Sequence, residues 1–335
     1  MSKRPMKTDI NQTHPRLLSA VIGQKPVVDY LKLSLEAHFN IRADCQESDV
    51  SFGPVLLAEP SGTGKTIIAK IIHAELGNDK LIETNGQTLK DKTELYAVLI
   101  GTDANSTVFI DEAQGLNTAA QHILLTALSE KKLYVPAAMN AAGSCALPLA
   151  NFITVLASTH EYLLQDALRN RIRIYCRFEY YSIQDIVEIV RQRIMALKWE
   201  VESDDVLQLI AQGCKHTPRL ALNRNLMTAW QVTLGHGRRV ITLEDVKEAF
   251  VHLQIDSQGL DQVDRNYLQV VLESKRTSLS ILSSVLSLPA YTVQRIVEPY
   301  LFKRGFVRKE GSLRVITEAG KNYIQNTDCN EEMLR

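Results

Sequence analysis

The chain has 335 residues, enough for two or three domains, and its 45% hydrophobic and 23% charged residues are ordinary for a soluble globular protein. Its 38 basic and 38 acidic residues give a formal net charge of zero, which excludes binding of nucleic acid through the overall field of the protein. Any contact with nucleic acid must therefore come from a local patch. The polar start has no apolar signal core and no apolar run approaches the roughly 18 residues of a membrane helix. Since the five cysteines also lack zinc-ligand spacing, we expect free thiols and a cytoplasmic protein with no membrane association.

The first half of the chain alternates short apolar runs with amphipathic stretches. After a polar tail over 1–14, this pattern predicts strands and helices whose ranges are 54–58, 81–85, 107–110, 152–158 and 173–180 for strands, and 25–39, 66–76, 93–100 and 118–129 for helices. Such alternation is typical of a parallel sheet with helices on both faces. We assign this α/β domain to residues 15–181.

Beyond residue 181 the pattern changes. Residues 182–255 show only helical periodicity, which predicts a separate helical domain. The polar stretch DSQGLDQ (256–262) indicates a linker, and 301–317 is typical of a β-hairpin that turns at Glu310, Gly311 and Ser312. We therefore predict a third, small domain over 256–325 and a tail over 326–335.

The stretch AEPSGTGKT (58–66) joins a predicted strand to a predicted helix, which is the setting of a phosphate-binding loop. Its glycines allow backbone N–H groups to point at phosphate oxygens, and the following helix adds its positive N-terminal end. Lys65 would reach the β- and γ-phosphates of ATP, and the Thr66 hydroxyl would hold Mg²⁺. The predicted ATP-binding residues of this loop are Gly62, Thr63, Gly64, Lys65 and Thr66.

The loop departs from the pattern G-x-x-x-x-G-K-[ST] at its first position, where Glu59 replaces glycine. Glycine there tolerates unusual dihedral angles, whereas glutamate adds a Cβ and a charge that would repel phosphate if it turned inward. The remainder of the pattern is intact. Three interpretations stay open: a site that binds and hydrolyses ATP, a binding module with weakened hydrolysis, and a site that does neither.

A pair of carboxylates follows the apolar strand in VFIDE (108–112). Asp111 would orient the hydration shell of Mg²⁺, and Glu112 would polarise the attacking water as a general base. The alternative is a solvated strand end. The position downstream of a phosphate loop, with a strand between, favours the catalytic interpretation.

A series of strings, in order along nearly the whole chain, resembles the RuvB family of AAA+ ATPases, the motor subunits of Holliday junction branch migration. The strings are IGQKPVVDYLKLSLEA (22–37), PSGTGKT (60–66), FIDEAQGL (109–116), LASTH (156–160), LRNRIRIYCRFEYY (168–181), HTPRLALNR (216–224), IDSQGLDQVDR (255–265) and EPYLFKRGFVRK (298–309). The last two are much narrower than general ATPase motifs. The resemblance implies an α/β nucleotide-binding domain, a helical lid and a winged-helix domain that contacts DNA, which agrees with the three predicted parts.

The resemblance also implies further catalytic residues. LASTH carries the sensor-1 polar residue, Ser158 or Thr159, which would hydrogen-bond the γ-phosphate or the attacking water. LRNR carries an arginine finger, Arg169 or Arg171, of which Arg171 is favoured. This arginine would reach into the site of a neighbouring subunit and stabilise transition-state charge.

Two segments are implied to contact the nucleotide from outside the loop. In HTPR, Thr217 can cap a helix that begins at Pro218, so that Arg219 lies in the first turn and can reach phosphate as sensor 2. Ile22 and the two residues after it match the family segment beside the adenine base, where the backbone would do the recognising.

Residues 133–150 keep the place of the hairpin with which the family meets its partner RuvA, including Ala/Gly-rich content around 141–144, but not the residues of the family. A RuvA-like partner, an unusual partner and no partner therefore all stay open.

The wing is a further departure from the family. Four cations there would neutralise DNA phosphates or would form an ordinary solvated face: Arg304, Arg308, Lys309 and Arg314. Tyr300 and Phe306 are expected in the core.

The leading interpretation is an ATP-driven, hexameric ring motor that uses Mg²⁺ and moves DNA branches, on four-way junctions or duplex arms, in recombination and repair. Because an arginine finger acts in trans, this interpretation requires association with copies of the same chain. A loader or switch, whose hydrolysis resets an assembly, is the alternative within the AAA+ class. The GLDQVDR string and the wing argue against it.

Overall fold

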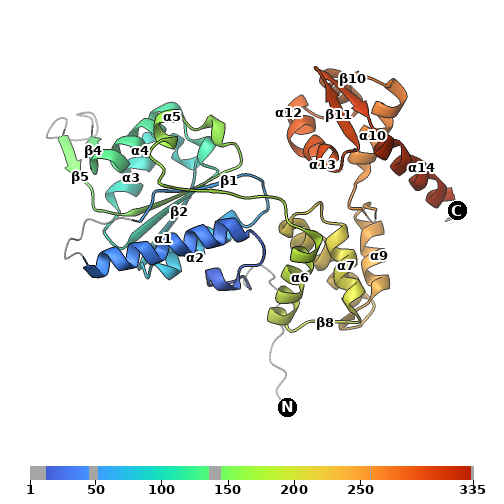
Figure 1. The fold of residues 1–335 in the computed structure, drawn as a ribbon, viewed down its shortest axis with the longest axis horizontal. Helices are drawn as coiled ribbons and strands as arrows, with labels where there is room; N and C mark the ends of the chain where they lie inside the picture. Colours follow the sequence, from blue (N-terminus) through green and yellow to red (C-terminus); the bar gives the residue numbers. More distant parts are fainter. Residues whose placement is uncertain (1–12, 45–51, 136–144, 257, 333–335) are drawn as a thin grey trace, which may run out of the picture. The chain divides into compact units, whose positions relative to one another are not determined.

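The computed structural model describes residues 13–44, 52–135, 145–256 and 258–332 (Figure 1). The chain forms two compact units. The first extends to Lys198 and includes His216–Arg219, and the second consists of Trp199–Lys215 and the chain from Leu220 onward. Within the described ranges, no helix has both the length and the apolar character to cross a bilayer. The domain boundaries placed after residues 14, 181, 255 and 325 stay predictions.

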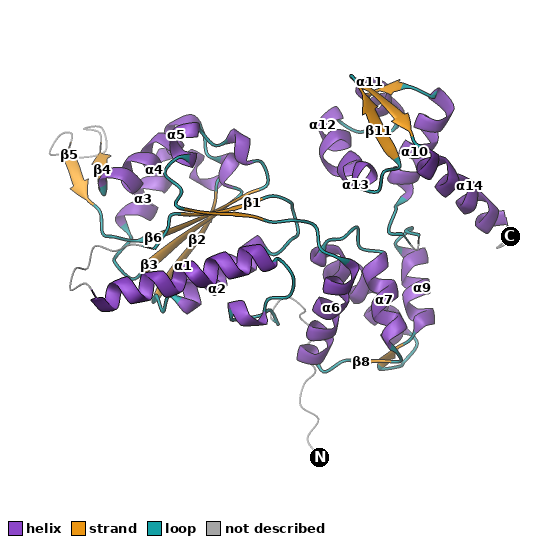
Figure 2. Cartoon of the chain, in the orientation of Figure 1, coloured by secondary structure: helices purple, strands orange, loops and turns teal. Residues whose placement is uncertain are grey.

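A five-stranded sheet forms the centre of the first unit, and all its neighbouring strands are parallel. Its order across the sheet is β2 (Lys80–Asn85), β3 (Ser106–Asp111), β6 (Ile153–Ser158), β1 (Val55–Ala58) and β7 (Ile174–Arg177). These are the five predicted strands, drawn orange in Figure 2. Because β6 lies between β1 and β3, the segments that follow these three strands meet at one edge of the sheet.

Helices cover both faces of this sheet. The first face packs against α1 (Lys25–Asp44) and α2 (Lys65–Glu75), and the second against α3 (Lys92–Ile100) and α4 (Thr118–Glu130). In β1, Val55 and Leu57 belong to the first core and Leu56 and Ala58 to the second, as the two-residue period of a strand requires. The predicted α/β fold with a parallel sheet is confirmed.

An antiparallel hairpin follows α4. It is formed by β4 (Lys132–Val135) and β5 (Cys145–Pro148), with Leu133 opposite Leu147. The hairpin predicted over 133–150 is thereby confirmed, whereas the stretch 141–144 lies outside the described residues. The helix α6 (Ile183–Leu197) and five short elements complete the described part of this unit. The short elements are η2 (Leu18–Ala20), η3 (Thr88–Lys90), η4 (Ala113–Gly115), η6 (Glu161–Leu163) and α5 (Asp166–Arg169).

The second unit begins with helices. They are α7 (Asp204–Gln212), η7 (Leu220–Leu226), α8 (Met227–Gly235) and α9 (Leu243–His252). The prediction of purely helical structure here was wrong in one detail, because β8 (Glu200–Val201) and β9 (Val240–Ile241) form a parallel pair. Strands of two residues are too short to show a two-residue period in the sequence.

A winged helix completes the second unit. Its elements are α10 (Gln262–Ser274), β10 (Thr277–Ser278), α11 (Leu279–Val285), α12 (Ala290–Thr292), η8 (Val293–Val297), α13 (Glu298–Lys303), β11 (Val307–Glu310), β12 (Leu313–Ile316) and α14 (Glu318–Glu332). The sheet order is β10, β12, β11, and the hairpin of β11 and β12 turns where predicted. Tyr300 and Phe306 lie in the core, as expected.

One ion pair inside the winged helix corrects a predicted DNA contact. The Arg314 side chain is 6% exposed, and its Nε and Nη2 donate to the two oxygens of Glu298 at 2.7 and 3.2 Å. The Tyr267 hydroxyl donates to the same carboxylate at 3.1 Å. Since the guanidinium is committed to Glu298 inside the core, we withdraw Arg314 from the predicted DNA contacts.

We predict that Arg314→Met destabilises the winged helix by roughly 3–5 kcal/mol, because it leaves the Glu298 carboxylate buried without its principal cation. Thermal unfolding of the full chain, followed by circular dichroism, measures the change. Arg308→Met is the matched control, since Arg308 is a 65% exposed cation on the neighbouring strand, and it is expected to leave the transition unchanged. Equal transitions for the two variants would contradict a structural role for Arg314.

Candidate nucleotide site

Residues 59–64 form a loop between β1 and α2, at the carboxyl end of a fully buried strand. Gly62 and Gly64 have φ values of +79° and +100°, which glycine adopts readily, and Gly64 directly precedes α2. Among the described residues, none accepts a hydrogen bond from the backbone N–H groups of 62–66. Unpaired donors at a helix N-terminus form an anion site, so this loop fits the phosphates of a nucleotide.

The predicted sensor-2 arginine lies against this loop. The helical segment that carries it begins at Pro218, as predicted. The Arg219 backbone N–H donates to the carbonyl of Gly62 at 3.3 Å, and Nη1 lies 3.5 Å from the Ser61 hydroxyl. A Cβ on Gly62 would lie 3.1 Å from Thr217 and 3.2 Å from Arg219, so a side chain here would press against both residues.

Glu59 adopts the conformation that explains why the pattern has glycine at its position. Its φ of +51° lies in the left-handed region, at a cost on the order of 1–3 kcal/mol for a residue with a Cβ. Its backbone N–H donates to the carbonyl of Ser158 at 2.9 Å, which fastens the loop to β6. In the part of the chain that the structure describes, no hydrogen bond or ion pair engages the Glu59 carboxylate. The substitution therefore changes the charge at the loop but preserves its backbone path.

Lys65 is almost buried and turns back into the loop. Its Nζ donates to the carbonyls of Pro60 at 2.7 Å and of Glu59 at 3.5 Å. Burial lowers the pKa of Lys65, while the charges of Glu112 and Asp111 act in the opposite direction. Phosphate oxygens are charged and would form stronger hydrogen bonds with this ammonium group than the two neutral carbonyl oxygens do.

The magnesium pair predicted from the sequence is brought together. The Thr66 hydroxyl donates to Oδ2 of Asp111 at 3.2 Å. Mg²⁺ prefers oxygen ligands and is usually held by one or two carboxylates together with water and phosphate oxygens. A hydroxyl and a carboxylate beside the phosphate loop fit that requirement.

A hydrogen-bond network joins Glu112, the predicted general base, to Ser158 and Thr159 at the end of β6. The Thr159 hydroxyl donates to Oε2 of Glu112 at 2.9 Å, whereas the Ser158 hydroxyl donates to the side chain of Gln114 at 2.7 Å. The Gln114 amide donates to the Thr159 hydroxyl at 3.0 Å and also to Glu112. Of the two sensor-1 candidates, Thr159 thus contacts the proposed base directly, and Ser158 is fully buried behind it.

The two arginine-finger candidates differ in their surroundings. Arg169 at the end of α5 is ion-paired with Asp166, whereas Arg171 is exposed and its guanidinium makes no hydrogen bond or ion pair with described residues. Arg171 lines an open groove of about 500 Å³ whose other wall is α4, including Ser129. The buried hydroxyl of Ser129 has no protein partner among the described residues. This comparison favours Arg171 as the residue available to another subunit.

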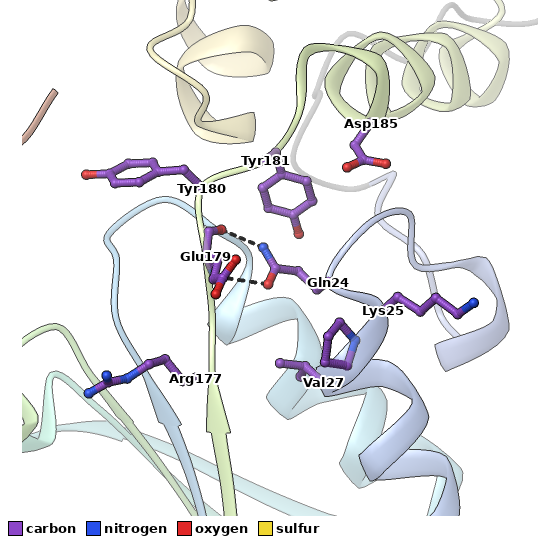
Figure 3. Close-up of a pocket in the computed structure, with 9 residues that line it drawn as sticks. Gln24, Lys25, Val27, Arg177, Glu179, Tyr180, Tyr181 and Asp185 are labelled. Carbon is purple, nitrogen blue, oxygen red and sulfur yellow. Dashed lines mark hydrogen bonds between the residues drawn. The ribbon is translucent and has the colours of Figure 1, made fainter. Parts of the chain in front are cut away.

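A pocket of about 200 Å³ lies beside the segment predicted to run along the base (Figure 3). Gln24 of this segment exchanges hydrogen bonds with the backbone of Glu179, at 2.6 and 3.1 Å. Tyr181 lines the pocket, and its hydroxyl donates to the carbonyl of Thr63 at 3.0 Å. Ile22 precedes the pocket without lining it. The pocket is therefore connected to the phosphate loop through Tyr181.

Three predicted DNA-contacting cations remain on the wing, and each has a protein neighbour. Arg308 is ion-paired with Glu310 at 2.8 Å, and Lys309 lies over the Phe302 ring. Arg304 is half-buried and donates to Gln258 at 2.6 Å. Arg308 and Lys309 are exposed, whereas Arg304 is half-buried, and the contact of all three with DNA stays a prediction.

Sequence reasoning missed two residues of the nucleotide site. Gln114 follows the two carboxylates in FIDEAQGL, and a polar side chain so close to a general base was the available signal. Tyr181 had no such signal, because its hydroxyl meets Thr63 only through the tertiary fold.

Comparisons with known proteins agree with this geometry. Residues 13–178 match the family described as Holliday junction DNA helicase RuvB P-loop domain, and residues 257–325 match the RuvB C-terminal winged helix domain. The Holliday junction branch migration complex subunit RuvB of Kosmotoga olearia is 30% identical over 314 residues, which is 92% of this chain and 89% of the relative. That of Thermotoga petrophila is 30% identical over 315 residues, 93% of this chain and 91% of the relative.

Solved structures of RuvB proteins are also similar to this chain. The Thermotoga maritima RuvB Holliday junction branch migration motor has a TM-score of 0.78 at 28% identity, covering 93% of this chain and 97% of that chain. A point mutant of the same protein has a TM-score of 0.81 at 27% identity, covering 94% of this chain and 98% of that chain. With a P-loop AAA+ domain and a C-terminal winged helix, this chain belongs to the RuvB family.

Proposed function

We propose that this chain is the motor subunit of a Holliday junction branch migration machine, which hydrolyses ATP to move DNA branches in recombination and repair. The observation that carries the proposal is the meeting, at one sheet edge, of the phosphate loop with the Thr66–Asp111 and Glu112–Thr159 pairs. The names of the similar proteins support it, since they are branch migration subunits.

Each group has a distinct role in the proposed reaction. The N–H groups of 62–66, Lys65 and Arg219 bind the phosphates. Thr66 and Asp111 would hold Mg²⁺, which would neutralise phosphate charge. Glu112 accepts a proton from the attacking water, and the Thr159 hydroxyl keeps its carboxylate in position. Arg171 of a neighbouring subunit stabilises the charge that develops in the transition state.

Neither alternative function has comparable support. A module without turnover rested on Glu59, but this residue adopts the left-handed backbone that the position requires, with φ of +51°. A loader or switch is less favoured, because the matched families are both those of branch migration proteins.

The proposal extends to assembly, partners and domains. It includes a hexameric ring, contact of Arg308 and Lys309 with junction or duplex DNA, and a RuvA-like partner at the β4–β5 hairpin. It also includes domains at 15–181, 182–255 and 256–325 between terminal tails, and a location in the cytoplasm with the DNA.

We expect ATP hydrolysis by the full chain to rise when four-way junction DNA is added, and labelled junctions to be converted to duplex products. Lys65→Ala should reduce hydrolysis on the order of 100-fold or more, since it removes the cation that stabilises phosphate charge. Glu59→Gly serves as the control for the altered loop and should change hydrolysis little. Hydrolysis without movement of the junction would favour a loader or switch.

Thr159→Val should lower kcat on the order of 100-fold, because the isosteric side chain cannot orient Glu112, and should leave the affinity for ATP nearly unchanged. Ser158→Ala, the matched control, should cost less than about tenfold, since the Ser158 hydroxyl does not contact Glu112; it donates to Gln114 and accepts from the His160 N–H. Steady-state kinetics and calorimetric titration with a non-hydrolysed ATP analogue separate kcat from binding. A larger loss in Ser158→Ala would reverse the assignment.

A mixing experiment tests the trans-acting arginine. Arg171→Ala and Lys65→Ala chains should each hydrolyse ATP poorly, and an equimolar mixture should recover activity, because intact loops in one chain then receive Arg171 from the other. Arg173→Ala, an exposed arginine two residues away, should retain activity alone. If Arg169→Ala complements Lys65→Ala and Arg171→Ala does not, the finger is Arg169.

A further inference from the structure

A five-residue segment, Lys215–Arg219, joins two separate sets of contacts. The chain passes at Lys215 from the second unit into the first and returns after Arg219. At its far end, the Arg219 backbone is hydrogen-bonded to Gly62 of the phosphate loop. The other end is held by a different part of the protein.

Lys215 is bound to the beginning of α10. Its Nζ lies 3.0 Å from Oδ2 of Asp261 and also contacts Oδ2 of Asp264. These two carboxylates cap α10 reciprocally, since Asp261 accepts from the Asp264 N–H and Asp264 accepts from the Asp261 N–H, both at 3.0 Å. The Asp264 side chain is 1% exposed and the Lys215 side chain 15% exposed. Two adjacent carboxylates in such surroundings need a cation, and Lys215 supplies it.

The backbone between the two ends has an unusual shape. Lys215 and His216 are consecutive left-handed residues with φ of +51° and +59°, although neither is glycine. The His216 carbonyl accepts from the Tyr181 N–H at 3.1 Å, and its Nδ1 lies 2.8 Å from the Tyr181 carbonyl. Left-handed backbone in residues with a Cβ persists only where the surrounding contacts enforce it, and it occurs often at functional sites.

We propose that Lys215 is a positioning residue that couples the phosphate loop to the winged helix. Binding of phosphate at Gly62–Thr66 fixes Arg219, the constrained segment carries this restraint to Lys215, and the ion pairs transfer it to the N-terminus of α10. The inference rests on the proposed function for its biological meaning, because a motor must link its ATP state to the element that contacts DNA. It requires only nucleotide binding for its test.

The test is hydrogen exchange of the amides at 261–268 in the full chain, with and without Mg²⁺ and the slowly hydrolysed analogue ATPγS. In the unmodified chain, the nucleotide should slow exchange of these amides on the order of fivefold or more, the lower end of typical coupling between sites. In Lys215→Met this effect should disappear, while calorimetry should give an affinity for ATPγS within about twofold of the original. Lys215→Arg should restore the effect because it keeps the cation.

Arg238→Met is the matched control. Arg238 also pairs with a fully buried carboxylate of the same unit, Asp245, but it lies outside the connecting segment. In Arg238→Met, the nucleotide should still slow hydrogen exchange of the amides at 261–268. If Lys215→Met fails to fold, Asp261→Asn replaces it, since asparagine still caps the helix and removes one of the two charges that hold Lys215; a reduced effect is then expected.

The proposal is overturned if nucleotide leaves exchange at 261–268 unchanged in the unmodified chain, if Lys215→Met or its substitute Asp261→Asn retains the full effect, or if Arg238→Met loses the effect equally. A failure of the proposed function gives a different result. A chain that binds ATPγS and shows the coupling, yet hydrolyses no ATP with junction DNA, would refute the motor and leave the coupling established.

Discussion

The N–H groups of residues 62–66, which have no protein acceptor among the described residues, are the constraint around which the first unit is organised. They exist because a fully buried strand ends in a loop with left-handed residues and turns directly into a helix. The order β3, β6, β1 then brings the ends of three strands to this loop, so that carboxylates, hydroxyls and a lysine surround one anion site. The chemistry follows from the sheet order as much as from the residues.

Glu59 illustrates how such a site tolerates a departure from its pattern. The requirement at this position is a backbone conformation, and glycine is the residue that adopts it most easily. Glu59 adopts it as well, held by the hydrogen bond from its N–H to Ser158 and by the loop residues that follow. The glycine of the sequence pattern is absent at this position, but the left-handed turn that it would form is present.

Two cations in the second unit neutralise carboxylates inside the protein. Arg314 neutralises the buried Glu298, and Lys215 neutralises the carboxylates that cap α10. Removal of either cation would leave a buried carboxylate without its partner, which is costly. Both residues therefore have structural or coupling roles. A count of basic residues near the wing therefore overestimates the surface available to DNA.

The sequence by itself determined the five parallel strands, the phosphate loop, the Asp111–Glu112 pair and the hairpin of the wing, because these depend on local periodicity and short spacing. Only the tertiary structure decided that Thr159 rather than Ser158 contacts Glu112, that Arg169 is ion-paired with Asp166, and that Arg314 is buried. It also revealed Tyr181 against Thr63 and Lys215 against α10. The physical reason is the same in each case: a side chain's partner lies far away in the chain, and neither spacing nor residue type carries information about which distant group it will meet.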